Sequence, residues 1–377
     1  MLGRRQGRAA KAFVDGEICP LGRAIDSASS LLRRSRQAVF AGLGCDIEGV
    51  RAVVRLAERI GGAIDHLSGT PYGREISVIR DAGLFVTTPG EAKVRADLVL
   101  LVGSSAFNAA RRLADPIFGK APRLAACDRP RRILWLGGKR LPPAHLLTAG
   151  LETTIVPNGQ LGPALAALGA CLARRQVSCP LPARRLSALA EALRQARFGV
   201  AVWSSEDLDE LALETLVSLV RDLNRTTRFS CLPLPPEDNA AGVAMALTWL
   251  TGFPSNIGFG RGNVEYDPWR FDAARLALSG EADLLLWISA YRDSRPAFPS
   301  QVPLIVLSRA AGAPRKWSAR IEIEVGRPGV DHDGIDLSAA TGQLAYRGTA
   351  SPGGAPSVAE VLGMIGKALD RASGARR

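Results

Sequence analysis

The chain has 377 residues, 47% of them hydrophobic and 22% charged, which is enough to bury more than one core. No apolar run reaches the ~18 residues that span a bilayer, and no apolar stretch like that of a signal peptide follows the basic N-terminus. We therefore expect a cytoplasmic protein without a membrane partner. The formal net charge is +12, and residues 111–197 hold most of it, with 15 Lys/Arg against 4 Asp/Glu.

The first part of the chain predicts alternating helices and buried strands. Apolar residues at helical spacing predict a helix over 24–32, and the run "AVFAGLG" (38–44) predicts a buried strand. The amphipathic pattern of "GVRAVVRLAERIGG" (49–62) predicts a helix that ends at its two glycines. With the apolar run "ADLVLLVGSS" (96–105) as the next strand, this spacing indicates a parallel βαβ unit.

Between that helix and that strand, "IDHLSGTPYGREIS" (64–77) has the composition of a cofactor-binding loop. Gly69 and Gly73 would let a ligand approach the backbone closely, and Asp65 would anchor a turn. The centre of the loop, residues 70–72, is Thr-Pro-Tyr and offers a metal almost no ligand atoms. The residues alone leave open whether the loop is a working site or the remnant of one.

The rest of the chain repeats the α/β pattern. Residues 120–180 predict a small α/β piece between two Pro-rich joints. Asp238 or Asn239 would cap one of the later helices. Near-continuous apolar strands favour a parallel sheet covered on both faces. The predicted strands are 132–138, 153–157, 198–205, 229–234, 282–289, 302–308 and 319–326, and the predicted helices are 161–175, 209–225, 240–252 and 357–372.

This pattern predicts an α/β protein with one doubly wound, mainly parallel sheet domain and a smaller inserted α/β domain. The larger domain would take residues 18–115 and 191–330, and the smaller, basic domain would take 116–190. A basic arm (1–17) would precede them, and a C-terminal segment (331–377) would pack its helix on the larger domain.

Cysteine and histidine spacing predicts no metal site. The cysteines form no Cys-x-x-Cys pair, and the three histidines share no metal-ligand spacing. His66 and His332 each stand beside an acid, which leaves a long-range pairing open. The cysteines are Cys19, Cys45, Cys127, Cys171, Cys179 and Cys231.

The basic segment 111–197 would attract a nucleic acid, an acidic partner or a polyanionic cofactor, or it would simply be solvated. Its aromatic residues are Phe118 and Trp135, too few for a base-stacking surface, and we expect no nucleic-acid partner.

Motifs for common enzyme classes are missing. "GLGCDIEG" (42–49) and "GFGRGN" (258–263) are neither dinucleotide fingerprints nor P-loops, and the chain has no G-x-S-x-G elbow. The acids of "EDLDE" (206–210) stand just before a predicted helix, where they suit its N-terminal dipole. We assign no catalytic residue.

Several blocks in order, from about residue 16 to 370, resemble the B subunit of formylmethanofuran dehydrogenase, a branch of the molybdopterin oxidoreductases. They include "GEICPLGRAIDSASSLL", "ERIGGAIDHLSG", "SGEADLLLWISA" and, most specifically, "PLPPEDNAAGVAMALTWLTGFPSNIGFGRGNVEYDP". The resemblance implies a molybdopterin-oxidoreductase-like fold, here without a counterpart of the C-terminal barrel that caps the pterin.

The departures from that family concern its cofactors. Metal-containing members hold tungsten or molybdenum with a Cys or selenocysteine at the position of Pro71, whose side chain has no ligand atom. Of the four cysteines that hold the iron–sulfur cluster, only Cys19 has a match. The pterin-cradling turn resembles "GSSA" (103–106), and a second turn resembles "AYRD" (290–293), both altered. The degenerate loop residues are Asp65, Pro71 and Gly73, and the retained ones are Asn239, Gly260 and Arg261.

This pattern is similar to B subunits of the bacterial formyltransferase/hydrolase complexes of methylotrophs. The resemblance implies a non-catalytic scaffold that binds neither metal nor pterin. The sister subunits would be an amidohydrolase-like protein that contains zinc (A), a formyltransferase (D) and a third protein (C). They would move a formyl group from formyl-tetrahydromethanopterin through a methanofuran analogue to formate. The competing hypothesis is an oxidoreductase subunit that still binds a metal–pterin cofactor.

The cofactors of this family carry glutamate tails, so arginines of the basic segment are candidates to hold such a tail, because arginine binds carboxylates in a bidentate manner. An alternative is that they face solvent or acidic sister subunits. The candidates are Arg111, Arg112, Arg123, Arg129, Arg131, Arg132, Lys139 and Arg140.

Overall fold

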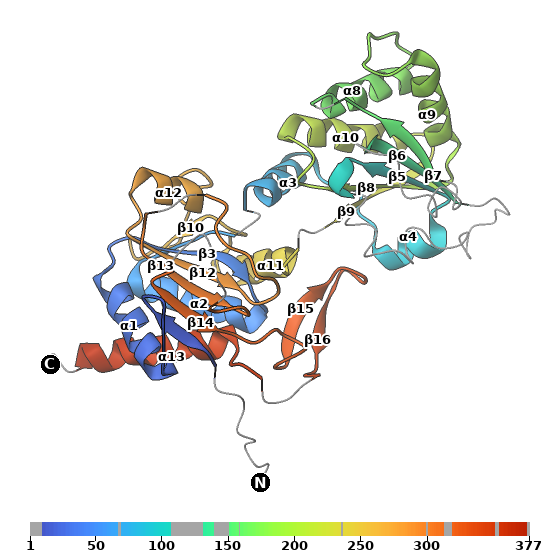
Figure 1. The fold of residues 1–377 in the computed structure, drawn as a ribbon. Helices are drawn as coiled ribbons and strands as arrows, with labels where there is room; N and C mark the ends of the chain where they lie inside the picture. The colour runs from blue at the N-terminus through green and yellow to red at the C-terminus, as the bar shows by residue number, and fades with distance from the viewer. Residues whose placement is uncertain are drawn as a thin grey trace. The chain divides into compact units, whose positions relative to one another are not determined.

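The computed structural model describes residues 10–66, 69–106, 131–138, 151–157, 159–234, 237–298, 301–312, 319–350 and 354–374. The chain divides into two compact units, drawn in Figure 1. The first unit comprises residues 1–70, 237–337 and 344–377, and the second unit comprises 71–236 and 338–343. No helix in the described part of the chain is long and apolar enough to cross a membrane.

The first unit contains a nine-stranded sheet in the order β11-β10-β4-β3-β12-β13-β14-β1-β2. The strands from β4 to β14 in this order run parallel, and the edge strands pair antiparallel. Strands β15 (Gly334–Ser338) and β16 (Gln343–Arg347) form a separate pair. The strands of the large sheet are β1 (Ala12–Val14), β2 (Glu17–Cys19), β3 (Ala38–Gly44), β4 (Ala63–Ile64), β10 (Ile257–Gly258), β11 (Glu265–Tyr266), β12 (Leu284–Ser289), β13 (Leu304–Ser308) and β14 (Ile321–Glu324).

Alternating residues of these strands face two different hydrophobic layers, because successive side chains of a strand point to opposite faces. On one face, Phe40 and Leu286 pack with helices α1, α2, α11 and α13. On the other, Val39 and Leu285 pack with α12. The helices are α1 (Leu21–Arg34), α2 (Ile47–Ile60), α11 (Ala240–Thr251), α12 (Ala273–Ser279) and α13 (Val358–Gly374).

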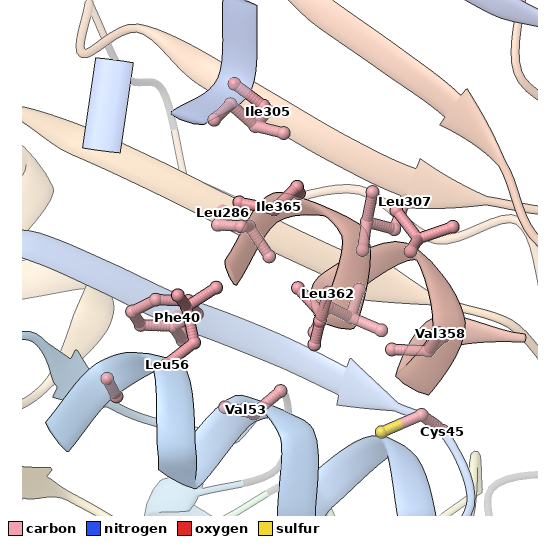
Figure 2. Close-up of a cluster of buried hydrophobic side chains, with 14 of the residues drawn as sticks. Phe40, Cys45, Val53, Leu56, Leu286, Ile305, Leu307, Val358, Leu362 and Ile365 are labelled. Atoms are coloured by element: carbon pink, nitrogen blue, oxygen red, sulfur yellow. The ribbon is translucent and has the colours of Figure 1, made fainter. Parts of the chain in front are cut away.

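Figure 2 shows the centre of the first layer. Leu362 and Ile365 of α13 point between the sheet and helix α2, where Val53 and Leu56 lie. Each of these four side chains is at most 4% exposed. The amphipathic periodicity of residues 357–372 predicted a helix, and this helix, α13, thus covers the sheet with its apolar side.

The second unit contains a five-stranded parallel sheet in the order β7-β6-β5-β8-β9. Helices α8, α9 and α10 pack on one face together with α3, and α4 packs on the other. The strands are β5 (Leu98–Val102), β6 (Arg132–Gly138), β7 (Leu151–Ile155), β8 (Phe198–Ser204) and β9 (Arg228–Leu234), and the helices are α3 (Gly69–Ala82), α4 (Pro89–Arg95), α8 (Leu161–Leu172), α9 (Ala183–Gln195) and α10 (Glu210–Leu223).

The structure divides the chain at different residues from those predicted. Strands β5, β8 and β9 were expected in the larger domain but pair with β6 and β7, so the inserted unit spans 71–236 rather than 116–190. The second Pro-rich joint, at residues 179–185, lies where α8 is connected to α9 within this unit, and the first joint lies outside the described residues. The predicted βαβ unit also has a different second strand, since the parallel partner reached through α2 is the short β4.

Candidate functional site

The stretch predicted to be a cofactor loop becomes a helix. Helix α3 begins at Gly69, and Pro71 lies in its first turn. Proline is tolerated there because the first backbone N–H groups of a helix have no intrahelical acceptor. The position predicted to match a family metal ligand therefore holds a residue that fits the helix and has no side-chain ligand atom.

The two glycines of this stretch differ in their surroundings. A Cβ added at Gly69 would lie 2.3 Å from Oδ1 of Asp65, so glycine is needed here for the approach of the chain's own carboxylate. A Cβ added at Gly73 would meet nothing within 4 Å. Helix α3 leaves the Cα of Gly73 open, so the approach of a ligand at this residue stays a prediction.

Asp65 is buried, and its carboxylate links separate segments of the first unit by hydrogen bonds. Its carboxylate accepts hydrogen bonds from the backbone N–H of Ala273 at 2.8 Å, from Nδ2 of Asn256 at 3.0 Å and from Oγ of Ser255 at 3.1 Å. Burial nevertheless raises the pKa of Asp65 to about 6. The predicted role of Asp65 in anchoring a turn extends to holding three segments together.

The next residue, His66, is 8% exposed, and burial lowers its pKa to about 4. The imidazole is therefore neutral at pH 7. His332 lies elsewhere in the first unit, with Nδ1 2.7 Å from the carbonyl of Asp333 and Nε2 3.3 Å from that of Gly326. Among the described residues, no three His, Cys, Asp or Glu side chains gather as metal ligands.

The carboxyl ends of β3 and β12 form a switch point of the first sheet, because the next parallel strands, β4 and β13, lie on opposite sides of this pair. Open α/β sheets bind ligands at such points. At this edge, beside β3, the side chain of Asn239 forms hydrogen bonds with the backbone. Its Nδ2 donates to the carbonyl of Cys45 at 2.9 Å, and its Oδ1 accepts from the N–H of Leu337 at 2.9 Å. Asn239 is the N-cap residue of α11, as predicted, but its side chain does not cap that helix.

An ion-pair cluster occupies the same edge after β12. Nε of Arg292 donates to both carboxylate oxygens of Asp238, at 2.8 and 2.9 Å, and the guanidinium also pairs with Glu237. Asp238 and Asn239 both have left-handed backbone, with φ of 60° and 63°, a conformation that Asp and Asn tolerate better than most residues. The altered turn "AYRD" thus supplies an arginine that is paired within the chain.

Gly260 and Arg261 do not join this edge. Gly260 approaches Gly61, the residue that ends α2, whereas Cys45 and Asp46 stand before the start of that helix. The 14 residues of α2 separate the two places, a length of about 21 Å at ~1.5 Å per residue. Arg261 is exposed and pairs with Glu265 at 3.4 Å. The retained family residues are therefore not one constellation.

The second sheet has its own switch point between β5 and β8, since β6 and β7 lie on one side of this pair and β9 lies on the other. The turn "GSSA" follows β5, and Gly103 has a φ of 90°. The carboxylate of Asp207, which follows β8, accepts from Ser105 N at 2.5 Å, Ala106 N at 3.3 Å, Ser104 Oγ at 3.1 Å and Ser105 Oγ at 3.0 Å.

Asp207 thus occupies the anion-binding face of the turn that resembles the family's pterin cradle. A Cβ at Gly103 would lie 2.4 Å from its Oδ2, so glycine is needed for this approach. The sequence predicted only that Asp207 favours the start of a helix. Asp209 does cap α10 by accepting from Ala212 N at 2.8 Å. The sequence did contain a signal for this contact, because an acidic residue follows one predicted strand and a Gly-Ser-Ser turn follows another predicted strand.

A buried carboxyl that the sequence did not single out belongs to the same unit. Glu75 of α3 is 4% exposed and accepts a hydrogen bond from Oγ of Ser205. Burial raises the pKa of Glu75. Burial, with the nearby carboxyl of Glu75 as a smaller cause, also raises the pKa of Tyr72 to about 12 and that of Cys231 to about 12.

Of the eight basic residues predicted to contact a glutamate tail, the structure describes Arg131 and Arg132. Arg131 is 5% exposed and donates to the carbonyls of Ala96 and Lys93, at 2.8 and 2.5 Å. It is a structural link to α4, so we withdraw it as a tail contact. Arg132 is exposed and pairs with Glu152 at 2.9 Å. The other six candidates, Arg111, Arg112, Arg123, Arg129, Lys139 and Arg140, lie outside the described residues.

The residues present do not fit a metal–pterin group. The predicted metal-ligand position is Pro71, the turn predicted to resemble the pterin cradle holds Asp207, and the edge beside β3 holds Asn239 with the Arg292 cluster. The fold and these edges define a two-unit parallel α/β protein of the kind that binds ligands at sheet edges, with hydrogen bonds and ion pairs of its own side chains at both edges.

Comparison with known proteins identifies the family. No protein-family model matches the chain. It is 33% identical over 371 residues to the B subunit of the formyltransferase/hydrolase complex Fhc of Methylorubrum extorquens, covering 96% of this chain and 97% of that protein. The chain belongs to this family of B subunits.

A solved structure agrees. A chain of the formyltransferase/hydrolase complex (FhcABCD) from Methylorubrum extorquens, crystallised with methylofuran, matches with a TM-score of 0.85 and 31% identity, over 96% of this chain and 99% of that one. The B subunit of the tungsten-containing formylmethanofuran dehydrogenase 2 of Methanocaldococcus jannaschii is 27% identical over 269 residues, covering 67% of this chain and 61% of that protein. The predicted relationship to both groups is confirmed.

Proposed function

We propose that this chain is a non-catalytic, structural subunit of a formyltransferase/hydrolase complex in one-carbon metabolism. Its sister subunits would transfer and hydrolyse the formyl group, with a methanofuran analogue as carrier and zinc in the amidohydrolase-like sister. This chain would bind no metal–pterin cofactor and would act in the cytoplasm. Its fold would be a molybdopterin-oxidoreductase-like scaffold that has lost its cofactor.

The observation that carries this proposal is Pro71 in the first turn of α3. A pyrrolidine ring offers no lone pair to tungsten or molybdenum, whose family ligand at this position is a thiolate or selenolate. A backbone or solvent ligand would be the only substitute at this position, which argues against the oxidoreductase alternative.

The filled sheet edges support the same conclusion independently. A pterin phosphate at the turn after β5 would have to displace the carboxylate of Asp207 from its hydrogen bonds to two backbone N–H groups and two hydroxyls. Charge-assisted hydrogen bonds of this kind are among the stronger ones in proteins. We infer that the turn was kept for folding after ligand binding was lost.

The basic segment retains a proposed role in the assembly. Arg132 is exposed enough to exchange Glu152 for a glutamate tail, because exposed ion pairs contribute about 0–1 kcal/mol. Acidic sister subunits are the competing partners of this surface.

Native mass spectrometry of the protein purified gently from its own cells, combined with elemental analysis, tests the proposal. We expect a large assembly with formyltransferase and amidohydrolase-like subunits, zinc in the assembly, and neither tungsten nor molybdenum in proportion to this chain. A lone chain, or one tungsten or molybdenum and a pterin mass per chain, would refute it.

An activity measurement complements the mass. The assembly with Pro71→Gly, which removes the ring but adds no ligand atom, should hydrolyse formyl carrier at the wild-type rate. Loss of activity from an assembly of unchanged composition would indicate that this position takes part in chemistry.

A further inference from the structure

A pocket of about 430 Å³ opens in the second unit, away from the turn at residues 103–106. Its walls are the last turns of α8, α9 and α10 and the residues that follow α8 and α10. Leu172, Leu219 and Leu223 line its centre, and a Cβ at Gly169 would meet nothing within 4 Å, so the pocket has an open apolar floor. Its charged lining residues are Arg174, Arg194, Arg225 and Asp222.

The charge of this rim favours an anion. Helix C-termini carry partial negative charge and by themselves repel anions. Here Arg194 donates to the carbonyls of Cys171 and Leu172, at 2.8 and 3.0 Å, and offsets the end of α8. Arg174 and Arg225 are exposed beside it, and Asp222 lies 3.4 Å from Arg225.

Arg174 also has an uncommon backbone. It follows the C-cap of α8 with a φ of 56°. Its N–H bonds to the carbonyl of Cys171, and the N–H of Arg175 bonds to that of Ala170, which is the Schellman pattern. Glycine is the usual residue at this left-handed position, since a Cβ is unfavourable there. An arginine in this glycine-type conformation at the mouth of a pocket motivates a role for its side chain.

We propose that this pocket binds an acidic segment of a sister subunit, with an apolar side chain on the leucine floor and its carboxylates on Arg174 and Arg225. An apolar centre with an arginine-bearing rim is the anatomy of a protein interface. A small-molecule site would instead show fixed polar groups inside the pocket, whereas Thr226 is the one uncharged polar side chain among the described residues that line it. This inference rests on the proposed function, because it needs an assembly.

The decisive variant is Arg174→Gly, studied in the full chain co-purified with its sister subunits. Glycine relieves the left-handed backbone, so the thermal midpoint of the isolated chain should stay unchanged or rise by about 1–4 °C. Affinity for the sister subunits should fall roughly tenfold, as expected for the loss of one interfacial arginine. The midpoint of assembly dissociation in a sodium chloride titration, read by native mass spectrometry, reports this affinity. A gain in stability with a loss of assembly would exclude damage to the fold.

Arg184→Ala is the matched control. Arg184 is exposed on α9 of the same unit, carries the same charge and does not line the pocket. An equal effect of both substitutions would mean that overall charge decides assembly, and would overturn the proposal. So would a wild-type salt midpoint for Arg174→Gly. If the wild-type chain purifies alone, it is the proposed function that fails instead.

Arg174→Lys identifies the occupant. The variant keeps the charge and adds an amine that a carbodiimide couples to carboxylates in direct contact. In the assembly we expect a cross-link to an acidic, apolar-containing peptide of a sister subunit, found by tandem mass spectrometry. A cross-link to a polyglutamate tail, one confined to this chain, or none at all would contradict the proposal.

Discussion

At the scale of single residues, Pro71 and Asp207 carry the proposal that this chain binds no metal–pterin cofactor. Pro71 stands where the family's metal-bearing relatives are expected to have a sulfur or selenium ligand, and helix α3 accommodates it in its first turn. Asp207 holds the turn after β5 with hydrogen bonds to Ser105 N and Ala106 N and to two hydroxyls. Both residues thus have structural contacts within the chain at the positions predicted for a metal ligand and a pterin turn.

Replacing Asp207 should destabilise the second unit. Asp207→Ala leaves two backbone donors without their acceptor, and we expect a loss of about 2 kcal/mol in the free energy of unfolding, measured by urea denaturation. Glu206→Ala is the control, since Glu206 is exposed beside it and should change stability little. Equal losses for the two variants would show that the turn does not depend on the carboxylate.

The buried His66 predicts a loss of stability in acid. Its pKa is lowered to about 4 in the fold, whereas an unfolded histidine titrates near ~6.5. The neutral ring therefore contributes stability above about pH 6.5 that disappears as the pH falls through about 4. The buried carboxyl of Asp65, with a pKa of about 6, acts in the opposite direction: it favours the fold at low pH and loses this contribution as the pH rises through about 6.

His66→Gln isolates the histidine contribution. Between pH 7 and pH 4.5 the wild type should lose about 2–3 kcal/mol more in the free energy of unfolding than the variant does. Urea denaturation at both pH values gives the change in the free energy of unfolding for the wild type and for the variant. Asp65 is present in both proteins, so its contribution cancels when the two changes are compared. Parallel pH profiles would mean that His66 does not titrate in this range.

At the scale of elements, α13 completes the first unit from the far end of the chain. Its buried residues Val361, Leu362 and Ile365 are at most 2% exposed and belong to the same cluster as Phe40 of β3. Figure 2 shows Leu362 between the sheet and α2. The helix is thus part of the core and not an appendage.

Shortening a buried side chain of this helix should lower the free energy of unfolding. Leu362→Ala removes buried methyl groups that the neighbouring helix cannot replace, and we expect a loss of about 2–5 kcal/mol in the free energy of unfolding. Lys367→Ala on the exposed side of α13 is the control and should be near neutral. A small effect of Leu362→Ala, read by chemical denaturation, would indicate that α13 frays from the sheet.

At the scale of the whole molecule, two sheets support two cores. Within the described part of the chain, each hydrophobic cluster draws its buried residues from one unit alone. The linkers cross between the units at residues 70–71 and 236–237 and again around the β15–β16 turn. Each core therefore has the composition of an independently cooperative domain.

Scanning calorimetry of the isolated chain should accordingly resolve two transitions. Leu362→Ala should lower the midpoint of one, and Leu168→Ala, which truncates a fully buried residue of the second unit, should lower the other. If both variants shifted one common transition, the chain would unfold as a single cooperative block.

Local chemistry in the sequence determined much of this structure. Periodicity predicted β3, α2 and α13 near their observed bounds, because an amphipathic face or a buried run is a property of neighbouring residues. Pro71 excluded a side-chain metal ligand at its position without any structure. The family relationship also followed from ordered blocks of residues.

Only the tertiary structure decided which strands share a sheet and which charges meet. The assignment of β5 to the second sheet depends on pairing between strands about a hundred residues apart, which no local pattern encodes. For the same reason, the sequence linked Asp207 only to the adjacent helix, and the fold brought it to the turn at residues 103–106. Arg131 was predicted at a surface and is buried, because its guanidinium finds backbone carbonyls on an element far from it in the chain.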